Sequence, residues 1–248
     1  MMDRSPRYSA IVFDLDGVLI DSEPIHLKAV EIMLARRGIR LTPEQAAQQT
    51  GITIHKFLER IVNDWGYPGP KAGEDWVAEK RVIFRQMAER ELQPVAGADE
   101  FLRLLHGRIK IGLASSSPRP YIDWIVQKFG WDGIFDAICT IEDVSQPKPD
   151  PEMYRLIARR LGLQPRSILA FEDSPAGIKA AVAAGMDCIG VGTSYQVEEL
   201  RAAGANWYIS DFTDRQTLAA LLGDEIVSNQ REVCAQWKED HRTTPGSA

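Results

Sequence analysis

Cysteine is scarce in this 248-residue sequence, positive charge is not in excess, and no long apolar run occurs. The three cysteines form no CxxC pair, so we expect neither a disulfide framework nor a cysteine zinc site, and we predict a reducing, cytoplasmic location. No run approaches the roughly 18 apolar residues of a membrane span. The N-terminal segment MMDRSPRYSA lacks the apolar stretch of a signal peptide.

The charge balance and the missing motifs exclude further classes of protein. With 35 acidic against 29 basic residues the net charge is -6, whereas nucleic-acid binding draws most of its affinity from a basic face. No GxSxG, P-loop or GxGxxG signature is present, and a serine or cysteine triad finds no support. The four histidines show no metal-ligand spacing. The sequence therefore predicts neither a nucleic acid nor a membrane as partner.

The sequence does contain a repeated pattern, in which a short apolar run ends in polar residues and helical periodicity follows. Unbroken apolar runs are typical of strands that are buried on both faces. The runs are Ala10–Phe13, Ile109–Ala114, Ser167–Phe171 and Cys188–Val191. Their alternation with helices predicts an α/β fold, with a Rossmann-like parallel sheet and right-handed crossovers.

Proline and glycine mark the ends of the predicted helices. Three dipeptides place a capping residue before a proline at the first helical position: Ser117-Pro118, Asp150-Pro151 and Ser174-Pro175. Three glycines follow the periodic stretches, where a helix commonly ends: Gly130, Gly162 and Gly185.

Residues 23–92 break the strand–helix alternation. They contain four amphipathic helical stretches: Glu23–Arg37, Pro43–Gln49, Thr53–Asp64 and Glu74–Glu91. We therefore predict an α-helical domain over 23–92, inserted into an α/β core formed by 1–22 and 93–222. Hinges are expected near Ser22 and Gln93-Pro94. The tail 223–248 is polar, and its end is expected to be disordered.

The chemistry is expected where ligands bind open α/β sheets, outside the carboxyl ends of the strands. Four carboxylates, a hydroxyl and an ammonium stand there: Asp14, Asp16, Glu172, Asp173, Ser115 and Lys148. Carboxylates clustered in this way repel one another unless a cation lies among them. Oxygen ligands favour a hard ion, and Mg²⁺ is the expected one where phosphate is the other partner. A lysine held between two prolines suits a phosphate.

Taken singly, these residues have simpler explanations. Asp14 and Asp16 could be solvated, capping acids at a strand end, and Glu172-Asp173 could cap the next helix. A calcium loop is excluded, because its fifth position would be Val18. Ser117 is predicted to be a helix N-cap, whereas Ser115 stands before that cap and can bind an anion together with backbone N–H groups.

Four segments in order carry a family resemblance: FDLDGVLIDSE at Phe13–Glu23, LASSS at Leu113–Ser117, PKPDPEMY at Pro147–Tyr154 and FEDSPAGI at Phe171–Ile178. They resemble the motifs of the haloacid dehalogenase-like hydrolase superfamily. Within it, the chain is similar to the β-phosphoglucomutase-like and phosphoglycolate phosphatase-like branch, in which a helical cap is inserted after the first motif.

The resemblance implies a reaction. Asp14 would attack phosphorus and form an aspartyl-phosphate, and Asp16 would protonate the leaving alcohol and then accept a proton from water. Mg²⁺ would be bound by the carboxylates of Asp14 and Asp173 and the backbone carbonyl of Asp16, with Glu172 nearby. The residues that would hold the phosphate are Ser115, Ser116 and Lys148. The implied function is phosphatase action on a small phosphorylated metabolite, by a monomer or weak homodimer.

Three other functions use a similar set of residues. A dehalogenase of this type would lack Asp16, and a phosphorylated receiver module would be about half as long and without the helical insert. A phosphomutase shares every core residue, but the arginine of the mutase cap turn is replaced here by Ile54. Other cap cations could substitute for it, namely His55, Lys56 and Lys80. The mutase resemblance also gives His26 a role in positioning the acid–base aspartate, although a lone helix histidine is more often a packing residue. His26, Ser22 and Lys80 are the candidate substrate contacts of the insert.

Overall fold

The computed structural model describes residues 7–49, 52–71 and 74–223. The chain divides into two compact units. One unit combines the segment up to Leu19 with the segment from Pro94 onward, and we call it the core unit. The other is Ile20–Gln93, which we call the helical unit. The predicted tail lies outside the described residues, apart from Gly223.

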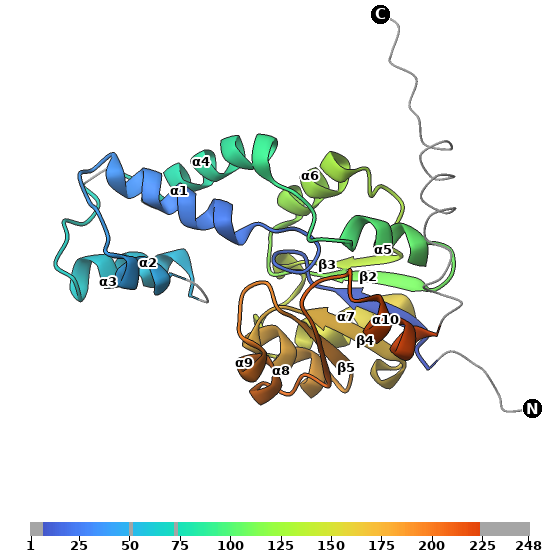
Figure 1. Cartoon of the computed structure of the whole chain (residues 1–248). Helices are drawn as coiled ribbons and strands as arrows, with labels where there is room; N and C mark the ends of the chain where they lie inside the picture. The colour runs from blue at the N-terminus through green and yellow to red at the C-terminus, as the bar shows by residue number, and fades with distance from the viewer. Residues whose placement is uncertain (1–6, 50–51, 72–73, 224–248) are drawn as a thin grey trace, which may run out of the picture. The chain divides into compact units, whose positions relative to one another are not determined.

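The core unit is built on a six-stranded, wholly parallel sheet with the order β3-β2-β1-β4-β5-β6 (Figure 1). Its strands are β1 (Ala10–Phe13), β2 (Lys110–Ala114), β3 (Ala137–Cys139), β4 (Ile168–Glu172), β5 (Asp187–Val191) and β6 (Trp207–Ile209). This arrangement confirms the predicted Rossmann-like α/β fold. The four predicted apolar runs are β1, β2, β4 and β5. The two edge strands were not predicted, because each has three residues and only its last is buried.

Helices cover both faces of this sheet. On one face, α7 (Glu152–Leu161) packs on β2 and β3, α8 (Pro175–Ala184) on β4 and β5, and α9 (Val197–Ala202) on β5 and β6. Within the described part of the core unit, the remaining helices are α5 (Ala98–Leu105), α6 (Arg119–Phe129) and α10 (Arg215–Leu222), with short 3-10 turns η1 (Ile141–Asp143) and η2 (Pro165–Ser167).

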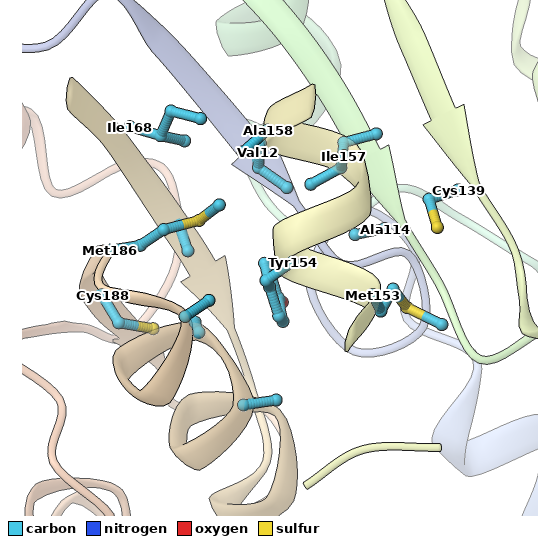
Figure 2. Close-up of a cluster of buried hydrophobic side chains, with 14 of the residues drawn as sticks. Val12, Ala114, Cys139, Met153, Tyr154, Ile157, Ala158, Ile168, Met186 and Cys188 are labelled. Atoms are coloured by element: carbon cyan, nitrogen blue, oxygen red, sulfur yellow. The ribbon is translucent and has the colours of Figure 1, made fainter. Parts of the chain in front are cut away.

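The central strand β1 is buried on both sides. Val12 belongs to a cluster of buried side chains that includes Tyr154 and Ile157 of α7 (Figure 2). Phe13 points to the other face, where its ring lies 5.0 Å from the ring of Phe171 and 6.1 Å from that of Phe101 in α5. Successive residues of a strand face opposite ways. Two-sided burial therefore explains why β1 reads as an unbroken apolar run.

The helix ends follow the sequence signals in part. Ser174 caps α8 by accepting a hydrogen bond of 3.1 Å from the N–H of Gly177, as predicted. The three glycines predicted to end helices adopt left-handed conformations at the ends of α6, α7 and α8. The other two capping predictions were wrong by one residue, because Pro118 and Pro151 occupy the N-cap positions themselves. Ser117 therefore does not cap α6.

The helical unit contains α1 (Glu23–Ala35), α2 (Pro43–Ala47), α3 (Ile54–Asn63) and α4 (Trp76–Glu91), and no strand among its described residues. Helices α1 and α4 pack against each other. In the sequence, the four helices of this unit lie between β1 and β2. Among the described residues, no helix combines the length and apolarity that crossing a membrane requires.

Candidate active site

The site lies at the carboxyl ends of β1 and β4, the two central strands of the core unit. Asp14 follows β1, and its N–H donates a hydrogen bond of 3.0 Å to the carbonyl of Phe171 in β4. Glu172 is the last residue of β4, and Asp173 follows it. The strand order reverses between β1 and β4, which is where open α/β sheets bind ligands.

Three buried acids meet at this point. Asp14, Glu172 and Asp173 each offer a carboxylate oxygen, and these oxygens lie within 4.8 Å of one another. Burial raises the pKa of Asp14 to about 7, an effect that the charge of Glu172 adds to and that Lys148 opposes. Burial, followed by the charges of Glu172 and Asp14, also raises the pKa of Asp173 well above its usual range. A hard divalent cation fits this donor set, since all the donors are oxygen and a cation would favour the ionised form that burial and mutual repulsion disfavour.

Lys148 is the ammonium of the site. Its Nζ donates to Oδ1 of Asp14 at 2.6 Å, to Oε1 of Glu172 at 2.7 Å and to the carbonyl of Ala114 at 2.9 Å. Burial disfavours its charge, but the two carboxylates outweigh that effect and hold the pKa of Lys148 above its usual value. Lys148 therefore remains charged and offsets part of the negative charge of the acids.

Glu172 is fixed from several sides. Oε1 also accepts a hydrogen bond of 2.7 Å from the hydroxyl of Tyr154, and Oε2 accepts one of 3.3 Å from Ser174. Gly177, in the first turn of α8, leaves room for the carboxylate, because an added Cβ would lie 1.9 Å from it. Neither Tyr154 nor Gly177 was predicted from the sequence to support the site.

Asp173 has partners that the sequence analysis missed. Its Oδ2 accepts a hydrogen bond of 2.5 Å from Ser194, while the neighbouring Thr193 donates to the carbonyl of Gly17. Gly17 has a φ of +77°, and a Cβ there would lie 2.0 Å from Oδ2 of Asp173. A signal for Thr193 and Ser194 was available, because both follow the apolar run of β5 as the other site residues follow theirs.

Asp16 lies apart from the three-acid cluster. Its Oδ2 accepts a hydrogen bond of 2.8 Å from Ser117, and its Oδ1 one of 3.0 Å from Tyr121. Ser115 is buried after β2, and its Oγ accepts a hydrogen bond of 3.0 Å from the N–H of Ser117. Ser116 is exposed.

The other candidate residues belong to the helical unit. Nζ of Lys80 lies 2.6 Å from Nδ1 of His26, and the imidazole of His26 stacks on Phe84 with ring centroids 4.0 Å apart. Ser22 is buried before α1, and its carbonyl accepts a hydrogen bond of 3.0 Å from the N–H of His26. These three residues therefore form one group at the start of α1 and on α4.

Comparison with known proteins gives a consistent result. Residues 8–185 match the family of haloacid dehalogenase-like hydrolases. The chain is 30% identical to validoxylamine A 7'-phosphate phosphatase of Streptomyces hygroscopicus subsp. limoneus, over 84% of this chain and 95% of that protein. It is also 30% identical to the fructose-1-phosphate phosphatase YqaB of Escherichia coli K12, over 75% and 97% respectively.

A solved structure shows the same fold. It is a HAD family hydrolase from Deinococcus radiodurans R1 with bound phosphate and sodium, 25% identical to this chain. The match covers 90% of this chain and 99% of that protein, with a TM-score of 0.74.

Proposed function

Since the chain belongs to the haloacid dehalogenase-like hydrolase family, we propose that it is a Mg²⁺-dependent phosphatase of a small phosphorylated metabolite, a sugar phosphate or a similar phosphomonoester. One observation carries the proposal: Asp14 is buried in contact with the ammonium of Lys148 and close to two further acids, at the point where the strand order reverses. The two relatives named as phosphatases of validoxylamine A 7'-phosphate and of fructose 1-phosphate support the substrate class.

The proposed reaction has two steps. A carboxylate oxygen of Asp14 attacks phosphorus, the bond from phosphorus to the alcohol oxygen breaks, and Asp16 gives its proton to that oxygen. Water then attacks the phosphorus of the aspartyl-phosphate and loses a proton to Asp16, while the bond to Asp14 breaks. Inorganic phosphate leaves, and both aspartates regain their starting states.

The residues around Asp14 would neutralise the charge of the phosphate and hold the phosphate in place. Lys148, with Ser115 and Ser116 after the neighbouring strand, would hold the phosphate oxygens on which charge accumulates. Mg²⁺ would be held by Asp14 and Asp173, with Glu172 nearby and with the backbone carbonyl of Asp16. The ion would neutralise the repulsion between a phosphate dianion and the acids.

The helical unit, predicted from the sequence as residues 23–92, would act as a cap that excludes water and selects the substrate. Ser22, His26 and Lys80 are the residues of this unit that we expect to contact substrate. We place the enzyme in the cytoplasm as a monomer or weak homodimer.

A phosphosugar mutase is the second candidate. It is favoured by the contact between His26 and Lys80, which provides a cationic group in the helical unit. It is disfavoured by Ile54, the first residue of α3, which cannot bind the distal phosphate that a mutase must hold.

Two assays test the proposal. Phosphate release is measured over phosphorylated sugars, sugar alcohols and small acids, with Mg²⁺ and with EDTA, using Asp14→Asn as the inactive control. Separately, β-glucose 1-phosphate is incubated with Mg²⁺ and a trace of the 1,6-bisphosphate. Glucose 6-phosphate that forms faster than free phosphate would identify a mutase instead.

A further inference from the structure

Ser117 and Tyr121 hold the two carboxylate oxygens of Asp16. The Oγ of Ser117 donates to Oδ2 at 2.8 Å, and the hydroxyl of Tyr121 donates to Oδ1 at 3.0 Å. Both donors come from the segment that opens α6, and both side chains are half-buried. Each oxygen of the Asp16 carboxylate thus accepts a hydrogen bond from a hydroxyl of this segment.

The helix itself does not account for these contacts. Ser117 was predicted to cap α6, but Pro118 occupies the N-cap and the hydroxyl of Ser117 points to Asp16 instead. Its N–H meanwhile donates to Oγ of Ser115 at 3.0 Å. Ser117 therefore links a residue proposed to hold phosphate with the residue proposed to move the proton.

The chemical type of both partners suits a group that changes its protonation state twice per turnover. A hydroxyl can donate to an ionised carboxylate and accept from a protonated one, whereas lysine, arginine and amide N–H groups can only donate. Two hydroxyls can therefore keep Asp16 oriented both as an acid and as a base. Positioned groups of this kind matter, because a displacement of about 1 Å can cost roughly 100-fold in rate.

We propose that Ser117 and Tyr121 are positioning residues for the acid–base carboxylate of Asp16. The proposal rests on the proposed phosphatase function and deepens it. When Asp14 attacks, the bond between phosphorus and the alcohol oxygen breaks, and the proton of Asp16 goes to that oxygen. An alkoxide needs this proton, whereas 4-nitrophenolate leaves without it.

The test compares leaving groups in Ser117→Ala, Tyr121→Phe and the double variant. kcat/KM is measured for the sugar phosphate that the screen shows to be hydrolysed fastest and for 4-nitrophenyl phosphate. This parameter covers only the steps up to release of the alcohol, so hydrolysis of the aspartyl-phosphate does not enter it. We expect the sugar phosphate value to fall about tenfold in each single variant, since general acid catalysis contributes roughly 100- to 10,000-fold. The 4-nitrophenyl phosphate value should change less than about twofold.

Three further variants separate positioning from structural damage. Ser117→Thr keeps a hydroxyl and should restore most of the sugar phosphate activity. Tyr8→Phe removes a tyrosine–carboxylate hydrogen bond of 2.6 Å to Asp187, and Ser145→Ala removes a serine–carboxylate bond of 2.9 Å to Glu152. Neither control should change the ratio of the two kcat/KM values.

Equal losses for both substrates, or no loss for either, in variants that keep the wild-type circular dichroism would overturn the positioning roles. A wild-type protein that hydrolyses neither substrate would overturn the proposed function instead, and this inference with it.

Discussion

The hydroxyl of Tyr154 lies 2.7 Å from Oε1 of Glu172, the same oxygen that accepts a hydrogen bond of 2.7 Å from Lys148. Tyr154 is fully buried on α7, within the side-chain cluster of Figure 2. Burial and the charge of Glu172 raise the pKa of Tyr154 well above its usual range, so its hydroxyl stays protonated and donates. The apolar core thus fixes the orientation of an acid in the site.

Replacing Tyr154 with phenylalanine removes that donor and leaves the rest of the side chain. We expect a loss of about 1–3 kcal/mol in the free energy of unfolding, because a buried carboxylate loses a charged hydrogen bond. We also expect the Mg²⁺ concentration for half-maximal activity to rise at least about tenfold, as for other supporting contacts around metal ligands. Tyr8→Phe is the matched control and should lose stability without a change in the Mg²⁺ requirement.

Asp14→Asn should lower kcat by roughly four to six orders of magnitude, because it removes the proposed nucleophile. The fold should survive, since the neutral amide relieves repulsion among buried acids and Lys148 keeps Glu172 as a partner. Phosphate release measures the loss of turnover, and the thermal midpoint of unfolding shows whether the fold survives. Activity above a tenth of the wild-type value would contradict the assignment of Asp14.

Metal removal should stop the reaction, because Lys148 alone cannot offset three converging acids. EDTA followed by dialysis should abolish phosphate release, and added Mg²⁺ should restore it and raise the thermal midpoint. Asp173→Asn should increase the required Mg²⁺ concentration by about 10- to 100-fold. Full activity of the dialysed protein in EDTA would show that no metal is needed.

Gly177→Ala should impair catalysis through Glu172. The new Cβ would lie 1.9 Å from the carboxylate, which must then leave its contacts with Lys148 and Tyr154. We expect at least a tenfold fall in kcat/KM, together with about 1–3 kcal/mol of destabilisation, as for other overpacked sites. Gly69→Ala is the control, because its Cβ would meet only the side chain of Val62, at 3.2 Å. A Gly177→Ala enzyme with normal kinetics would show that the position of Glu172 is not critical.

Much of the fold could be predicted from the sequence, because strands that are buried on both faces consist of unbroken apolar runs, as β1 does. The sequence did not reveal β3 and β6, because these edge strands are short and only partly buried. Asp14 and Asp173 could be predicted, because ligands bind at the carboxyl ends of strands. Once a strand is recognised in the sequence, the residues that follow it are known. Tyr154 could not be predicted in this way, because a side chain that reaches the site from a helix depends on tertiary packing.

Ser117 shows a different limit of sequence reasoning. A serine before a proline is a good local capping signal, and propensity favoured that use. In the structure the helix begins one residue later, and the hydroxyl donates to Asp16, which lies far away in the sequence. The local capping preference of Ser117 is therefore overridden by a long-range hydrogen bond to Asp16, and we place Ser117 in the active site.

The backbone pairing where the helical unit begins and ends has an evolutionary consequence. The carbonyl of Leu19 accepts a hydrogen bond of 3.0 Å from Val95, and the N–H of Asp21 donates one of 3.0 Å to the carbonyl of Gln93. The outgoing and returning chains thus run side by side, so the insertion behaves as a module with adjoining ends. Any other segment whose ends meet at that spacing could be exchanged for it without altering the sheet. Because we propose that the helical unit selects the substrate, such an exchange would change the substrate and leave the proposed chemistry of the core unit in place.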